Sequence, residues 1–68
     1  MKQIDARGRS CPEPVLMTKK GLKESPEGVI VLVDNATAMG NIQRFAGNQK
    51  YNVAVEQQGE DYQLTITK

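Results

Sequence analysis

The amino-acid sequence predicts an α+β fold, a two-layer sandwich in which two helices cover one face of a four-stranded mixed sheet. Segments with apolar residues at helical spacing alternate with short apolar or alternating segments, in the order βαβαββ. A short polar turn separates the last two strands, which therefore pair antiparallel, whereas helical crossovers favour parallel pairing of the earlier strands. The 68 residues form one domain, residues 1–68, because the chain is too short for two.

The N-terminal half of the chain contains the first strand and the first helix. Residues 2–6 form a short strand, and the Gly and Ser of segment 7–10 suit a loop. Residues 12–25 are mostly good helix formers, and Pro26 and Gly28 end this helix.

One face of the first helix carries Val15, Thr18 and Leu22 at helical spacing. Gly21 lies within the same helix, where a glycine costs about 1 kcal/mol relative to alanine. Close packing against a neighbouring element would explain it.

The middle of the chain predicts a buried strand followed by a second helix. Residues 29–33 are all apolar, which indicates a central strand, but this pattern would leave apolar side chains on the uncovered sheet face unless a partner covers it. Asn35 is a suitable N-cap residue, and the helix ends near residues 47–48. The apolar face of this helix consists of Ala38, Ile42, Phe45 and Ala46.

The C-terminal segment predicts two half-buried strands joined by a hairpin turn at residues 58–61. Apolar residues alternate with polar ones in residues 51–56 and again in residues 62–67. The inward-facing positions are Tyr51, Val53, Val55, Tyr62, Leu64 and Ile66.

Composition excludes several classes of function. A net charge of +1 and only three aromatic residues disfavour nucleic-acid binding, which needs a basic surface and stacking platforms. One cysteine and no histidine leave no internal disulfide and no Cys/His zinc site, so no metal is expected. We find no apolar signal segment and no apolar run long enough to cross a bilayer, so we expect a soluble cytoplasmic protein.

Cys11 is the one side chain with obvious nucleophilic chemistry. Pro12 suits the first helical position, which makes Cys11 the predicted N-cap residue, with its sulfur at the positive end of the helix. Arg7 and Arg9 would add positive potential, so we expect the pKa of the thiol to be lowered.

The residues after Cys11 predict a rigid turn. Pro14 removes a second N–H from the first helical turn, which leaves the amides of Glu13 and Val15 as donors to sulfur. A residue before proline disfavours helical backbone, so Glu13 must either be helical or distort the turn.

The composition of the chain limits the reactions that Cys11 can perform. Without histidine a Cys-His hydrolase dyad cannot form, and without a second cysteine there is no internal resolving thiol. A reactive thiolate could then accept sulfur as a persulfide, form a mixed disulfide or sense oxidation. The alternative is an incidental, buried cysteine in a non-catalytic regulatory or protein-interaction domain.

The sequence Asp-Ala-Arg-Gly at residues 5–8, followed by Cys-Pro-Glu-Pro at residues 11–14, resembles the signature of the TusA-like (SirA-like) sulfur-carrier family. The resemblance extends over essentially the whole chain and is closest to the N-terminal domain of YedF-like selenium-metabolism proteins. It implies the βαβαββ sandwich and a persulfide on Cys11. The sulfur would come from a cysteine desulfurase or rhodanese-like donor and pass to an acceptor protein.

The resemblance also assigns roles to individual residues. Cys11 would carry the sulfur as a sulfurtransferase-like carrier rather than a turnover enzyme, without metal or organic cofactor. The supporting residues would be Asp5, Arg7, Gly8, Pro12, Glu13 and Pro14. Alternatively, Arg7 only pairs with Asp5 or Glu13, and Gly8 only turns the chain. The same domain could also be the N-terminal part of a selenium-metabolism protein.

Overall fold

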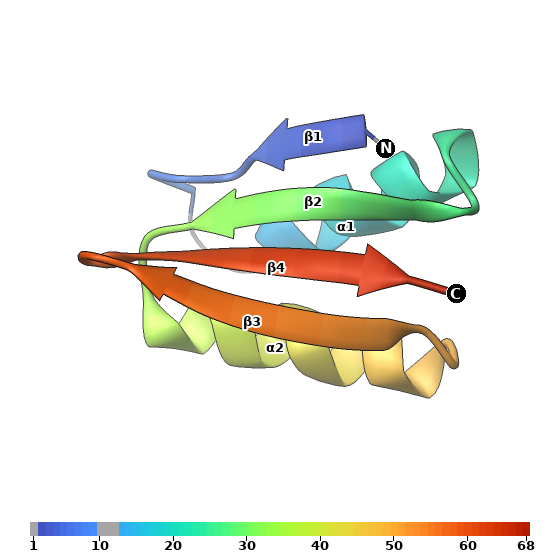
Figure 1. Cartoon of the computed structure of the whole chain (residues 1–68). Coiled ribbons are helices and arrows are strands. Elements are labelled where there is room, and N and C mark those ends of the chain that lie inside the picture. The colour runs from blue at the N-terminus through green and yellow to red at the C-terminus, as the bar shows by residue number, and fades with distance from the viewer. Residues whose placement is uncertain (1, 10–12) are drawn as a thin grey trace.

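The structure is a computed structural model that describes residues 2–9 and 13–68. The described elements alternate between strands and helices before the final hairpin, and Figure 1 labels them in chain order. They are β1 (Lys2–Asp5), α1 (Glu13–Glu24), β2 (Gly28–Val33), α2 (Ala36–Asn48), β3 (Asn52–Gln58) and β4 (Asp61–Thr67). The predicted βαβαββ sandwich is confirmed.

The four strands form one mixed sheet in the order β1-β2-β4-β3, which the sequence alone left open (Figure 1). β1 pairs parallel with β2, while β4 pairs antiparallel with both β2 and β3. The two β-strands at the centre of the sheet are therefore the most apolar strand and the C-terminal strand, and the edges are β1 and β3.

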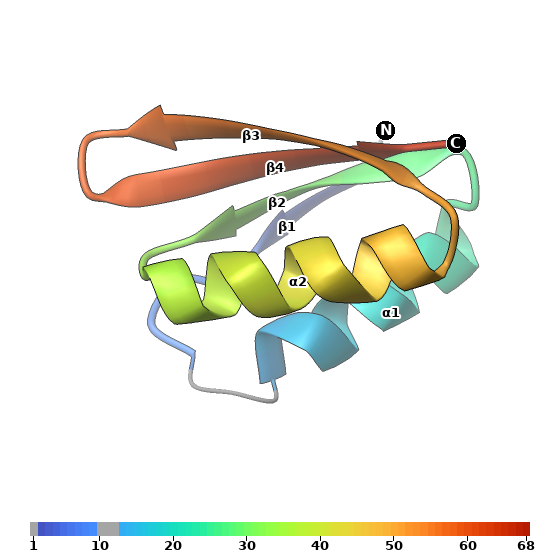
Figure 2. The same cartoon turned by 90° about the horizontal axis from the view of Figure 1, so that it is seen from below.

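Both helices lie on the same face of the sheet, as Figure 2 shows. At one end of the molecule, β1 and β2 terminate, α1 and α2 begin, and the turn between β3 and β4 is found (Figures 1 and 2). We call this end the loop end, because residues 6–9, which follow β1, lie there.

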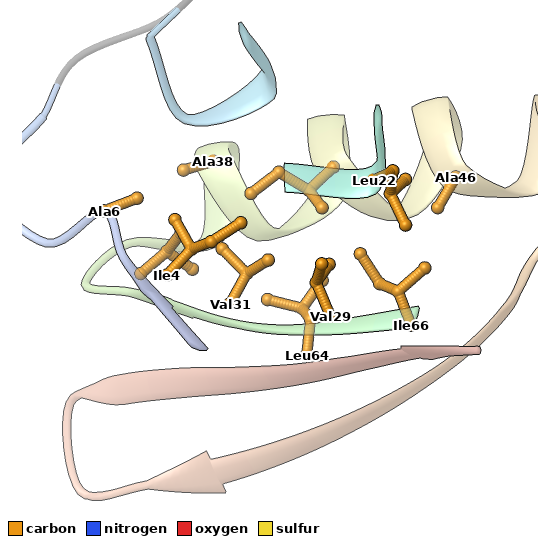
Figure 3. Close-up of a cluster of buried hydrophobic side chains, with 11 residues drawn as sticks. Ile4, Ala6, Leu22, Val29, Val31, Ala38, Ala46, Leu64 and Ile66 are labelled. Carbon is orange, nitrogen blue, oxygen red and sulfur yellow. The ribbon is translucent and has the colours of Figure 1, made fainter. Parts of the chain in front are cut away.

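The core fills the space between the sheet and the helices (Figure 3). Val29, Val31 and Val33 of β2 are fully buried, and their alternation sets the inner face of the sheet. The buried hydrophobic residues are Ile4, Ala6, Leu22, Val29, Val31, Val33, Ala38, Ile42, Ala46, Leu64 and Ile66. The predicted inward positions of α2 are confirmed for three residues, and Phe45 packs half-buried at the margin of this cluster.

Gly21 lies where α1 approaches the sheet most tightly. A Cβ at this position would overlap the end of the Ile4 side chain and touch Val29. The glycine in the middle of the helix is thus explained by the close approach of α1 to β1 and β2, as predicted.

The predicted burial of the third strand is wrong in one position. Val53 is half-buried, but Val55 is 39% exposed. β3 is an edge strand, and it diverges from α2 toward its hairpin with β4 (Figure 2). Alternation in the sequence specifies which face a residue is on, and not whether that face is covered.

The outer face of β2 carries Ile30 and Leu32, and both are half-buried rather than exposed. The large hydrophobic side chains exposed in the described part of the chain are Leu16 and Val55. Neither of them belongs to this outer face, so the expected apolar patch on the open sheet is reduced to two partly covered residues. Within residues 2–9 and 13–68, neither helix has the length and apolar character needed to span a membrane.

Candidate functional site

The structure places five of the seven predicted site residues at the loop end. Asp5 is the last residue of β1, Arg7 and Gly8 form the turn that follows it, and Glu13 and Pro14 open α1. Cys11 and Pro12 lie outside the described residues, and so do the predicted N-cap role and lowered pKa of Cys11.

Arg7 connects the start of the chain to the C-terminal hairpin. Its Nε and Nη2 atoms donate to the two carboxylate oxygens of Asp5 at 2.9 and 2.8 Å. The backbone N–H of Arg7 also donates to Asp5, at 3.1 Å. Its Nη1 atom lies 3.2 Å from Oδ2 of Asp61 at the start of β4. Arg7 therefore contacts two carboxylates from opposite ends of the sequence.

These contacts change the ionisation of both partners. The side-chain hydrogen bonds from Arg7, with the backbone N–H of the same residue, lower the pKa of Asp5 from its ordinary 3.8 to about 2. The pKa of Arg7 is raised above its already high value, because Asp5 and then Asp61 accept its hydrogen bonds. The pair is thus fully charged at neutral pH.

Gly8 is held by the connection between β2 and α2. Its φ of +78° lies in the left-handed region, which favours glycine, and its N–H donates to Oδ2 of Asp34 at 2.8 Å. The other oxygen of Asp34 accepts from Nδ2 of Asn35 at 3.1 Å. Asn35 caps α2 by accepting from the N–H of Ala38 at 2.7 Å, as predicted from the sequence.

The first turn of α1 is fixed from both sides. The carboxylate of Glu13, which has helical backbone despite the proline that follows, lies 3.3 Å from Nη1 of Arg9. Pro14 is fully buried, and its carbonyl accepts from the hydroxyl of Thr18 at 2.8 Å. Pro14 therefore packs into the core rather than lining an exposed surface, and as the second helical residue it needs no N–H partner.

The electrostatic environment differs from the one expected. Both arginines of the loop are matched by carboxylates, Arg7 by Asp5 and Asp61 and Arg9 by Glu13. The positive potential expected from these arginines is therefore offset by their partners. Of the two carboxylates that the sequence offered as partners of Arg7, the structure shows Asp5, with Asp61 in addition, while Glu13 pairs with Arg9.

Two residues at the loop end, Asp34 and Asp61, were not among the predicted site residues. Asp34 carried a usable signal, because it directly follows a buried strand that pairs parallel with β1, and adjacent parallel strands end at the same edge of a sheet. Asp61 carried none, since its contact with Arg7 joins residues 54 positions apart and depends on the strand order.

Comparison with known proteins agrees with this fold. The sequence matches the family model described as "Sulfurtransferase TusA" over residues 2–68. This chain belongs to the TusA family. A TusA-family relative from Methanocaldococcus jannaschii, named as a sulfur carrier protein, is 42% identical over 71 residues and covers 100% of this chain and 95% of its own length.

Two further relatives extend the comparison of this TusA-family chain. A protein of Archaeoglobus fulgidus, also named as a sulfur carrier, is 43% identical over 44 residues, covering 62% of this chain and 57% of the relative. The crystal structure of a SirA-like protein from Desulfitobacterium hafniense superposes with a TM-score of 0.88 at 38% identity, covering 98% of this chain and 96% of that one. The specific similarity to YedF-like N-terminal domains stays a prediction.

Proposed function

We propose that this TusA-family protein relays sulfur by holding it as a persulfide on Cys11. The observation that carries the proposal is that the family model described as "Sulfurtransferase TusA" matches the chain from residue 2 to residue 68, while the sequence offers one cysteine. A sulfur carrier needs a thiol, and Cys11 is the sole candidate.

The proposed transfer is an exchange between sulfur atoms. The thiolate of Cys11 attacks the outer sulfur of a persulfide on a donor cysteine, an S–S bond forms on Cys11, and the S–S bond of the donor breaks. The donor leaves as a thiolate and the proton stays on the transferred sulfur. No external oxidant or reductant is consumed, and the same step with an acceptor thiolate regenerates Cys11.

The residues around the loop have supporting roles in this proposal. Arg7 and Asp5 hold the segment before Cys11, Gly8 turns it, and Pro12 and Pro14 stiffen the segment after it. The partners are a donor of the cysteine desulfurase or rhodanese type and an acceptor protein. A cytoplasmic location suits the relay, because thiols stay reduced in that compartment.

Loading with sulfur tests the proposal. The purified protein is incubated with a cysteine desulfurase and free cysteine, and its intact mass is recorded with and without reductant. We expect the wild type to gain one sulfur atom that the reductant removes, and Cys11→Ser to gain none while its circular dichroism stays native, since serine is a good N-cap residue.

The same measurement has two outcomes that contradict the proposal. A sulfur adduct on Cys11→Ser would remove Cys11 from the mechanism. A wild type without an adduct, beside a desulfurase shown to be active, would favour the alternative of a protein-interaction domain.

A further inference from the structure

We infer that Asp61 and Asp34 are positioning residues for sulfur transfer, because they hold the turn at Arg7 and Gly8 that precedes Cys11 in the chain. This inference rests on the proposed sulfur-relay function. It concerns two residues outside the Cys-Pro-Glu-Pro motif, one on the β3–β4 hairpin and one between β2 and α2.

The loop before Cys11 is attached to the rest of the molecule on two sides. On one side, the Nη1 atom of Arg7 reaches Asp61 at 3.2 Å. On the other, the N–H of Gly8 reaches Asp34 at 2.8 Å. Because Arg7 and Gly8 are adjacent, these two contacts fix both the side chain and the backbone of the same turn.

Each anchor is itself held by an element of the fold. Asp61 is the first residue of β4, and it pairs in the sheet with Gln58 across the hairpin turn. Asp34 is tied through Asn35 to the first turn of α2. The turn at Arg7 and Gly8 is therefore fixed relative to the C-terminal hairpin and to α2, and not only to β1, which precedes it.

The distance along the chain makes these anchors relevant to the sulfur. Two residues, Arg9 and Ser10, lie between Gly8 and Cys11, so three Cα–Cα steps keep the Cα atom of Cys11 within roughly 11 Å of that of Gly8. On the other side, the helix starts at Glu13, two residues after Cys11. Since small misplacements of a reacting atom slow transfer strongly, we expect loss of an anchor to lower the rate about tenfold.

The experiment is single-turnover persulfide transfer from a cysteine desulfurase to Cys11, measured over a range of donor concentrations. The variants are Asp61→Asn and Asp34→Asn. Glu60→Gln is the matched control, because it removes one negative charge from the neighbouring residue, which is exposed in the same turn. Asp61→Glu is a second control, because it keeps a carboxylate able to reach Arg7. Thermal unfolding checks that each variant is folded.

We expect the limiting rate to fall about tenfold in both Asn variants, with the half-saturating donor concentration changed less than twofold. Glu60→Gln stays at the wild-type rate, and Asp61→Glu recovers most of it. Arg7→Gln combined with Asp61→Asn is no slower than Arg7→Gln alone, because both act through one contact.

Three results would overturn the inference. Wild-type limiting rates in the Asn variants would show that the anchors do not position the thiol. A raised half-saturating donor concentration at an unchanged limiting rate would make these residues part of a docking surface instead. A wild type that accepts no sulfur would refute the relay, and with it the positioning role, and is recognised before any variant is compared.

Discussion

Asp5 and Arg7 form an ion pair whose contribution to folding depends on pH. The pKa of Asp5 is about 2 in the folded protein against an ordinary value of 3.8, because Arg7 donates to both of its oxygens. The unfolded chain therefore binds this proton first as the pH falls. The contribution of the pair is present in full above pH 3.8 and is lost as the pH drops toward 2.

This ionisation gives the first prediction at the scale of single residues. Asp5→Asn should unfold more readily than the wild type at pH 7, and the difference should shrink steadily between pH 4 and pH 2. Urea unfolding at a series of pH values measures it, with Glu60→Gln as the control for loss of a negative charge. A constant difference between the two proteins down to pH 2 would mean that the carboxylate of Asp5 does not carry the effect.

Some residues of the candidate site could be predicted from the sequence and others could not. Asp5, Arg7 and Gly8 were identified through the resemblance to a family signature, and the structure brings them to one end of the molecule. The partner of Arg7 on the hairpin could not be identified, because nothing in the sequence specifies which strand lies beside β2. Contacts between distant segments follow from the strand order, and local patterns do not contain it.

At the scale of elements, the cap of α2 links helix stability to the candidate site. Asn35 accepts from the N–H of Ala38 and donates to Asp34, which in turn holds Gly8. We predict that Asn35→Ala lowers the free energy of unfolding by about 1 kcal/mol, the usual cost of losing an N-cap. Asn35→Asp should retain most of the stability because its carboxylate still caps the helix. A free energy of unfolding that is the same in Asn35→Ala as in the wild type would show that the cap contributes nothing.

The two helices differ in how they tolerate their internal glycines. A Cβ at Gly21 meets Ile4 and Val29, whereas one at Gly40 meets no described atom within 4 Å apart from its chain neighbours and the backbone of its own helix. We predict that Gly21→Val destabilises the protein by about 1–3 kcal/mol through overpacking. Gly40→Ala should stabilise it by about 1 kcal/mol, since alanine is the better helix former.

Thermal or urea unfolding of the two glycine variants decides between packing and propensity. Equal effects of the same sign at both positions would contradict the close approach of α1 to the sheet. The sequence indicated this approach only indirectly, through a glycine placed where helix propensity disfavours it.

Helices and the buried strand were predicted well because their patterns are local. Asn35 was identified as a cap residue and the apolar face of α2 follows helical spacing, so both were confirmed. Val55 lies opposite buried Leu64, on the face that alternation predicts, but it is exposed because β3 is an edge strand that α2 covers only in part. Burial on an edge strand depends on which elements pack over it, and this is a property of the whole fold.

At the scale of the whole molecule, the core and the candidate site occupy different regions. The buried cluster lies between the sheet and the two helices, while Asp5, Arg7, Gly8 and Glu13 are exposed at the loop end. Substitutions at the loop end should therefore change transfer more than stability. A small domain of this kind has a narrow stability margin, so changes of about 1 kcal/mol in the core should be easy to measure.

In the proposed relay, Cys11 receives sulfur by direct contact with a donor protein. The most direct measurement is the intact mass of the protein after incubation with a cysteine desulfurase and cysteine, once in the same compartment and once across a dialysis membrane. We predict a reductant-sensitive gain of one sulfur in the shared compartment and none across the membrane. Equal loading in both arrangements, or loading in neither, would contradict it.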